Sequence, residues 1–231
     1  MILKKWEDLP EEFKNSEVKV YYDILSKKKF SLLLKRIFDI VVSFTMLAIA
    51  LPFFIILAIL IKIDSKGPVF YRQERVTRYN KKFKIFKFRT MVNNADKKGA
   101  LITGKNDSRI TRVGKFIRKC RLDEVSQLID VLRGTMSFVG TRPEIPKYVD
   151  KYTPEMYATL LLPAGVTSMA SIKFKDEDEI LENYKGEDVD HVYVEKILPE
   201  KMKYNLQAIK EFSFFKEIGT MFKTVIAVFK R

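Results

Sequence analysis

Residues 40–61 form an uninterrupted run of 22 uncharged and mostly apolar residues, and this run limits what the chain can fold into. About 20 such residues are enough for a helix to cross the hydrocarbon core of a bilayer. Helices of soluble proteins seldom stay apolar on every side over this length, because one side normally faces water. The run starts too far along the chain, and lacks the cleavage site, for a cleaved secretory signal. The sequence therefore predicts that this segment inserts into a membrane.

Two features of the run disagree with a simple transmembrane span. Pro52 lies in its middle, where proline removes a backbone hydrogen bond and kinks or breaks a helix. Lysine and arginine residues both precede and follow the run, and such residues favour the cytoplasmic side. A helix that breaks at Pro52 and returns to the same face keeps both flanks in the cytoplasm. A kinked single span is the alternative, since membrane helices tolerate proline. The flanking charges favour the re-entrant form.

The positive charge of the chain is concentrated in one segment. The chain has 43 Lys and Arg residues against 29 Asp and Glu, a formal net charge of +14. Residues 72–121 contain 17 of the basic residues and three acidic ones, so this segment accounts for the whole excess. A basic segment beside a membrane binds anionic lipid, and aromatic residues within it could stack on nucleic acid bases. One function that stays open is therefore a non-enzymatic, membrane-anchored protein that binds polyanions.

The hydrophobic pattern of the remaining chain predicts a mixed fold. Alternating aromatic and β-branched residues at 68–76 and 83–91 predict the two strands of a β-hairpin. Short helices are expected at 113–119 and 123–132. An amphipathic helix is expected at 206–229, where it either packs on the core or lies in the membrane surface. The predicted fold class is α+β, mostly helical with a small β-hairpin, and attached to the membrane through the Pro-broken re-entrant helix hairpin and amphipathic helices.

Two patterns resemble functional motifs without their context. Residues 99–106, GALITGKN, nearly match a phosphate-binding loop, but Asn106 replaces the metal-binding hydroxyl and no buried strand precedes the motif. The single histidine, His191, has no cysteine or histidine within the spacing of a metal site. Neither pattern predicts a functional site.

Asp123 and Glu124 form the most informative pair, because they directly follow the cations Arg118, Lys119 and Arg121. Nearby cations and the start of a helix favour an ionised carboxylate, so we expect a depressed pKa for Asp123. An ionised, positioned aspartate can act as a nucleophile, and arginines match the oxygens of a phosphoryl group. Ordinary ion pairs at a helix start would involve the same residue types. The residues alone leave both interpretations open.

A set of motifs, spread in order over residues 35–229, resembles the bacterial sugar transferase family, the monotopic phosphoglycosyl transferases. The motifs are Lys35-Arg36-x-x-Asp39, GPVFYRQERV, FKIFKFRTM, DSRITRVGKFIRK, LDEVSQLIDVLRGTMSFVGTRPE and GVTSMAS. The sequence departs from the family pattern at Thr141, where members usually have proline, and at Leu51, where they often have serine. The residues after Thr167 also differ, which affects the expected sugar contacts and leaves the reaction unchanged.

The resemblance implies an enzyme that moves a sugar 1-phosphate from a nucleotide sugar, expected to be a UDP-sugar, to polyprenol (undecaprenyl) phosphate. This would be the first membrane step in the assembly of an exopolysaccharide, capsule or glycoconjugate. By the resemblance, Asp123 attacks the donor and forms a covalent phosphosugar–Asp intermediate, while Glu124 has a supporting acid/base or metal role. Family members use Mg²⁺, for which Asp123 is the expected ligand. Four cations are the expected phosphate ligands, the last of them the weakest candidate: Arg118, Arg142, Lys87 and Arg89.

The resemblance also implies a division of the chain and a location. We expect an N-terminal arm at residues 1–34, a re-entrant membrane helix at 35–63, and a catalytic domain at 64–231. The domain would lie on the cytoplasmic face of the bacterial inner membrane. The expected partners are the nucleotide sugar, polyprenol phosphate and the lipid bilayer. Nucleic acid is not expected, because the carboxylate pair would repel it. The sequence leaves open whether the chain forms a homodimer.

Overall fold

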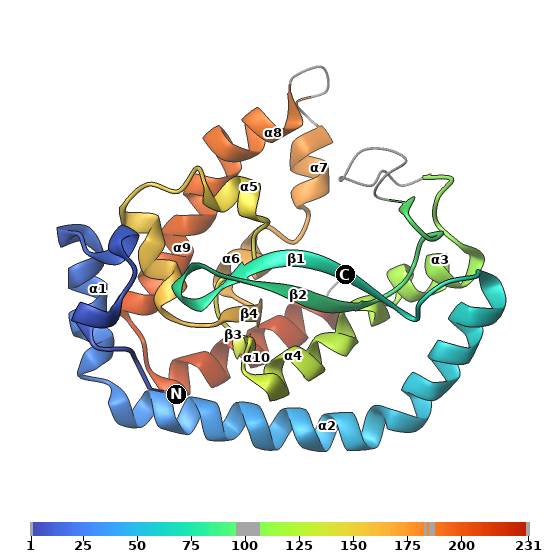
Figure 1. The fold of residues 1–231 in the computed structure, drawn as a ribbon, viewed down its shortest axis with the longest axis horizontal. Helices are drawn as coiled ribbons and strands as arrows, with labels where there is room; N and C mark the ends of the chain where they lie inside the picture. Colours follow the sequence, from blue (N-terminus) through green and yellow to red (C-terminus); the bar gives the residue numbers. More distant parts are fainter. Residues whose placement is uncertain (1, 96–106, 183, 185–187, 230–231) are drawn as a thin grey trace.

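The computed structural model describes residues 2–95, 107–182, 184 and 188–229. One long helix, α2 (Lys29–Asp64), runs along one edge of a mostly helical body that also contains two small sheets (Figure 1). The chain begins with three short helices that pack at one end of the body: η1 (Trp6–Asp8), η2 (Glu11–Phe13) and α1 (Ser16–Ser26). The mostly helical α+β class expected from the sequence is confirmed.

Helix α2 is one continuous helix of 36 residues with Pro52 inside it. Within the part of the chain that the structure describes, it is the one helix long and apolar enough to cross a membrane. The expected hairpin is not confirmed: Figure 1 shows α2 curving at its C-terminal end, and its two arms do not double back on each other. Many of its apolar side chains are exposed, among them Phe44, Ile49 and Ile63. An apolar surface of this kind is seldom exposed to water in soluble proteins, and it suits contact with lipid.

Both ends of α2 are bound to the same folded body. Near its start, Lys35 donates a hydrogen bond to the carbonyl of Val139 at 2.8 Å and forms a buried ion pair with Glu217 at 2.6 Å. Near its end, the Asp64 carboxylate accepts a hydrogen bond from the backbone N–H of Val113 at 2.8 Å. The uncharged run thus lies between two points of attachment to one domain.

Arg89 closes the C-terminal end of α2. The last carbonyls of a helix have no partner inside it, and an external donor can satisfy them. The guanidinium of Arg89, which is buried, donates to the carbonyls of Ser65 (2.6 Å), Lys66 (2.9 Å) and Ile61 (3.4 Å). This side chain therefore holds the end of the β-hairpin against the C-terminal end of α2.

The expected β-hairpin is present. Strands β1 (Phe70–Thr77) and β2 (Lys81–Phe88) are antiparallel, and Phe70 faces Phe88 across the sheet. Their connection, η3 (Arg78–Asn80), places Tyr79 and Asn80 in the left-handed region, with φ of 58° and 57°. Such values reverse the chain within few residues.

A second sheet was not predicted from the sequence. Strands β3 (Met136–Val139) and β4 (Ala164–Thr167) are parallel, four residues each, and mostly buried. The chain after β3 passes so close to β4 that a Cβ on Gly165 would lie 2.1 Å from the backbone nitrogen of Gly140. The Thr77 hydroxyl joins the two sheets, since it donates to the Thr135 carbonyl at 2.6 Å and accepts from Ala164 N–H at 3.1 Å.

The other helices and strands that the described chain forms are all helices, joined by loops. The helix expected at 113–119 is present, and the one expected at 123–132 is a 3₁₀ segment followed by a short α-helix. The helix expected at 206–229 is interrupted between residues 210 and 214. The elements are α3 (Arg112–Lys119), η5 (Leu122–Gln127), α4 (Leu128–Arg133), α5 (Pro146–Val149), η6 (Glu155–Leu161), α6 (Met169–Lys173), α7 (Glu177–Glu182), α8 (Val189–Val192), the π-helical η7 (Tyr193–Ile197), α9 (Leu198–Lys210) and α10 (Phe214–Phe229).

The core extends into the N-terminal residues. The buried side chains of Leu9, Phe13 and Tyr21 belong to the same apolar cluster as those of η6 and α9. On α10, one side packs on the body, where Thr224 is hydrogen-bonded to Thr167 at 2.8 Å. The other side leaves exposed apolar residues that include Phe215, at 79%. Core packing is thus confirmed for one side of this helix, and contact of the other side with a membrane stays a prediction.

Replacing Arg89 by methionine should destabilise the fold, because the carbonyls at the end of α2 lose their donors. Unsatisfied buried carbonyls cost about 2 kcal/mol, which corresponds to a thermal midpoint lower by about 4–8 °C in a chain of this size. Thermal unfolding of the detergent-solubilised protein measures this midpoint. The matched control is Lys82→Met on strand β2, which leads directly to Arg89; the side chain of Lys82 is exposed. Equal midpoints for the two variants would contradict the capping role.

Candidate active site

The two neighbouring carboxylates lie where α3 passes into η5. Arg121 adopts a left-handed conformation (φ 53°), which turns the chain between the two helices. Asp123 and Glu124 follow in the first turn of η5, and this turn packs against β2 of the hairpin. The short 3₁₀ segment thus presents both carboxylates beside the strand that carries Lys87.

Glu124 joins three separate segments of the chain. Its Oε1 atom accepts a hydrogen bond from Lys87 of β2 at 3.1 Å and from Arg142, in the loop after β3, at 2.7 Å. The side chains of Lys87 and Glu124 are 20% and 23% exposed, and that of Arg142 is 43% exposed. The two cations therefore lie side by side near the protein surface, with one carboxylate between them.

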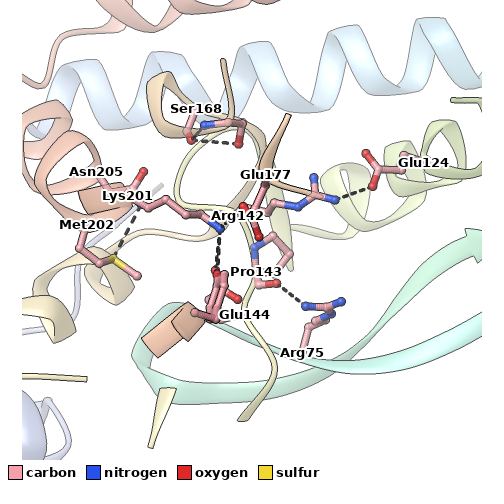
Figure 2. Close-up of polar contacts among 12 residues, drawn as sticks. Arg75, Glu124, Arg142, Pro143, Glu144, Ser168, Glu177, Lys201, Met202 and Asn205 are labelled. Atoms are coloured by element: carbon pink, nitrogen blue, oxygen red, sulfur yellow. Dashed lines mark hydrogen bonds and ion pairs between the residues drawn. The ribbon is translucent and has the colours of Figure 1, made fainter. Parts of the chain in front are cut away.

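The loop that carries Arg142 is held by its backbone. The N–H of Gly165 donates to the Thr141 carbonyl at 2.8 Å, and the N–H of Val76 donates to the Glu144 carbonyl at 2.9 Å. Arg75 adds a hydrogen bond to the carbonyl of Pro143 at 3.1 Å (Figure 2). Thr141, where the family usually has proline, is thus held by a backbone hydrogen bond from strand β4.

The environment of Asp123 differs from the expectation. Burial raises the pKa of this carboxyl above its ordinary value and the charge of Glu124 raises it further, while Lys87 and Arg118 lower it less. The depressed pKa predicted from the neighbouring cations is therefore wrong, because burial outweighs them. Within the described residues, no side chain forms an ion pair with Asp123. The result is a poorly solvated carboxylate without a fixed partner.

Glu124 has the opposite balance. Burial would raise its pKa, but Arg142 and Lys87 together hold the pKa well below the usual range of a glutamate. Glu124 in turn raises the pKa of Arg142, while burial lowers the pKa of Lys87. Glu124 is therefore ionised at neutral pH and acts as a counter-ion for the two cations. An ionised carboxylate of this kind cannot donate a proton.

The structure brings four of the predicted site residues together: Lys87, Asp123, Glu124 and Arg142. Arg118 lies nearby in the last turn of α3, and within the described chain it forms no ion pair with either carboxylate. Arg89 lies elsewhere, because both terminal nitrogens of its guanidinium donate to carbonyls at the end of α2. The expectation that Arg89 binds phosphate therefore does not fit its position.

A cavity of about 590 Å³ opens beside this cluster. Its charged wall includes Arg121, Glu124 and Arg142, and its apolar wall includes Met46 of α2 and Met221 of α10. This cavity therefore connects the ion-paired cluster to α2 and α10, the two helices with exposed apolar surfaces. A ligand that combines a phosphate with a hydrocarbon chain would suit both walls.

The structure does not test the near-match to a phosphate-binding loop. Residues 99–106, which resemble a phosphate-binding loop, lie outside the described residues. Among the residues that the structure does describe, no group of three or more metal-binding side chains occurs. The sequence did not identify Arg75 and Lys201. Both contact the loop that carries Arg142: Arg75 at the Pro143 carbonyl and Lys201 at the Glu144 carboxylate (Figure 2).

The Lys87–Glu124 contact should show coupling in a double-mutant cycle. Glu124→Gln leaves two cations side by side without their counter-ion, and Lys87→Met removes one of them. We expect the double variant to be more stable than the sum of the single changes by about 1 kcal/mol. Thermal unfolding of the four proteins measures this energy. Additive changes would show that the two side chains do not interact.

Comparison with known proteins identifies the family. The family model described as "Bacterial sugar transferase" matches residues 30–231. A Bacillus subtilis protein, provisionally named as an undecaprenyl-phosphate N-acetylgalactosaminyl 1-phosphate transferase, is 46% identical over 125 residues, 54% of this chain and 70% of that protein. The UDP-N-acetylgalactosamine-undecaprenyl-phosphate N-acetylgalactosaminephosphotransferase of Aeromonas hydrophila is 35% identical over 83% of this chain and 43% of its own length.

A third relative extends the comparison to another sugar. The UDP-glucose:undecaprenyl-phosphate glucose-1-phosphate transferase of Escherichia coli is 32% identical over 85% of this chain and 40% of its own length. The matched region thus spans less than half of the Aeromonas and Escherichia relatives. The family match covers most of the chain, including the four clustered residues, and therefore the chain belongs to the bacterial sugar transferase family.

Proposed function

We propose that the protein transfers a sugar 1-phosphate from a UDP-sugar to undecaprenyl phosphate, as the first membrane step in the assembly of an exopolysaccharide, capsule or other glycoconjugate. The names of the relatives support both substrates. The observation that carries the proposal is the position of Asp123, a poorly solvated carboxylate beside two cations. The adjoining cavity reaches the apolar helices, so a lipid phosphate and a nucleotide sugar could use the same cluster.

The proposed reaction has two displacements at phosphorus. A carboxylate oxygen of Asp123 forms a bond to the β-phosphorus of the donor, and the bond from this phosphorus to the bridging oxygen breaks, so that UMP leaves. A phosphate oxygen of the acceptor lipid then attacks the same phosphorus, and the bond to Asp123 breaks. Weak solvation suits Asp123 for the first step, because water does not have to be removed from the attacking oxygen.

Lys87 and Arg142 are the proposed diphosphate ligands. Glu124 holds them side by side, and the partly exposed guanidinium of Arg142 has donors beyond the one that Glu124 uses. Arginine presents several N–H groups in a plane, a geometry that matches phosphate oxygens. The role proposed for Glu124 is therefore to position these cations. Arg118, at the edge of the cluster, is proposed as an outer phosphate ligand.

Mg²⁺ is the proposed cofactor, and Asp123 is the residue that would hold it. Magnesium in phosphoryl-transfer sites commonly takes one or two carboxylates, with water and substrate phosphates as its other ligands. The site fits this type, since Glu124 is occupied by cations while Asp123 lacks an ion pair within the described chain. When bound, Mg²⁺ would neutralise charge on the diphosphate.

The proposed membrane arrangement follows from the attachments of α2. One body binds this helix near Lys35 and again near Asp64, so both ends belong on the same side of the bilayer. The exposed apolar residues between them, together with those of α10, would enter one leaflet. We propose that α2 enters the bacterial inner membrane from the cytoplasmic face and does not cross it.

Asp123→Asn should abolish UMP release from UDP-sugars, because an amide cannot attack phosphorus. The measurement uses purified protein, Mg²⁺, a panel of UDP-sugars and undecaprenyl phosphate, and release should also stop when EDTA removes the metal. Asp150→Asn, at an exposed carboxylate away from the cluster, is the matched control. Full activity of Asp123→Asn would disprove the nucleophile assignment. No release from any donor by the wild type would favour the alternative function, a membrane-anchored polyanion binder.

Cysteines placed at Lys28 and Lys66, both exposed and flanking α2, should react with a membrane-impermeant thiol reagent from the same side. The background is Cys120→Ser, which removes the single native cysteine. In intact cells both positions should stay protected, and in inverted vesicles both should be labelled. Labelling of one position from each side would show that α2 crosses the bilayer.

A further inference from the structure

Lys201 of α9 is a buried lysine that lies behind Arg142. The residue is 4% exposed and borders the cavity, on the opposite side of Arg142 from Glu124 (Figure 2). A buried ammonium group is costly unless it is paired. Its Nζ atom contacts three oxygens: those of Tyr193 (2.8 Å), Glu177 (3.0 Å) and Glu144 (3.4 Å). A lysine has three N–H donors, so these contacts leave none for a substrate.

The two carboxylates bound by Lys201 are not equivalent. Glu144 is buried and also accepts a hydrogen bond from the Tyr193 hydroxyl at 2.6 Å. Glu177 has a 30% exposed side chain, and within the described residues Lys201 is its one partner. Glu144 can therefore keep its place without Lys201, whereas Glu177 cannot.

Both carboxylates act on Arg142. The pKa of Arg142 is raised chiefly by Glu124, and further by Glu144 and Glu177, so the charges of these last two reach its guanidinium. Arg142 is also partly exposed, on a side chain long enough to change direction. A carboxylate released at position 177 would therefore be a competing partner for this guanidinium.

We propose that Lys201 is a positioning residue that keeps Glu177 away from Arg142, so that the guanidinium stays directed at Glu124 and at the donor diphosphate. The inference rests on the proposed function, which assigns Arg142 to the diphosphate. Lys201 acts entirely through its neighbours: it touches neither substrate nor the reacting atoms. Without its charge, Glu177 and the diphosphate compete for the same N–H donors.

The test compares kcat/KM for the UDP-sugar, measured as UMP release by the full-length protein. Lys201→Met should lower kcat/KM by about tenfold, the size expected when close charges are coupled. Lys201→Met combined with Glu177→Gln should restore it to within about threefold of the wild type, because the competing charge is gone. Lys203→Met, on the same helix with a 69% exposed side chain, is the matched control and should have no effect.

The second-site rescue separates this role from simple support of the fold. Loss of stability from an unpaired Glu144 would not be repaired at position 177. Unchanged kcat/KM in Lys201→Met, or a loss that Glu177→Gln does not relieve, would overturn the proposal. Glu177→Gln alone should stay within about threefold of the wild type. A tenfold loss in Glu177→Gln would mean that the carboxylate binds substrate, which would also overturn the proposal. This single variant tests the proposal even if Lys201→Met does not fold.

The inference and the proposed function can fail separately. If the wild type releases no UMP, the function is wrong. If the wild type is active and the Lys201 variants do not behave as described, the inference alone is wrong.

Discussion

The ion pairs of Glu124 with Lys87 and Arg142 are the interaction on which the site depends. Two like charges would not stay side by side in a half-buried position without a carboxylate between them. The two cations come from separate parts of the fold: Lys87 lies in the β-hairpin, and Arg142 lies in the loop that follows β3 of the second sheet. Glu124 thus links these two segments at the point where two phosphates are proposed to bind. Asp123, its neighbour, remains available because Glu124 takes both cations.

The second constraint is the attachment of α2 at both ends. Helix α2 exposes many apolar side chains, a surface that suits lipid, yet Lys35 and Asp64 hold its two ends on one body. Together these requirements favour a domain that lies on one leaflet. The cavity lies between the charged cluster and the same helix, so a lipid phosphate bound there would lie next to the proposed nucleophile.

The sequence predicted the elements whose patterns are local. Alternation was enough for the β-hairpin, and spacing was enough for α3 and for the amphipathic α10. Strands β3 and β4 were missed because they are four residues long, almost wholly buried and paired across more than twenty residues of intervening chain. No alternation marks a strand that is covered on both sides. Backbone chemistry led us to expect a break in the helix at Pro52. Helix α2 instead continues through this residue.

For the candidate site, the sequence predicted most of the residues but not their electrostatic environment. The resemblance to the family indicated Lys87, Asp123, Glu124 and Arg142, and these residues lie together. Electrostatics were less predictable: adjacent cations suggested a depressed pKa for Asp123, while burial, which depends on tertiary packing, raises it. The resemblance also indicated Arg89 as a weaker candidate for a phosphate ligand, but this side chain is buried and binds the end of α2. Lys201, more than fifty residues from Arg142, had no local signal at all.

The central claim is that Asp123 forms a bond to phosphorus. Mass spectrometry of the acid-quenched protein, after incubation with the correct UDP-sugar and Mg²⁺ but without undecaprenyl phosphate, tests it directly. The account predicts a mass increase of one sugar phosphate, located on the peptide that contains Asp123 and lost when undecaprenyl phosphate is added. An adduct on a different residue, or transfer to the lipid with no adduct under any quench condition, would contradict it.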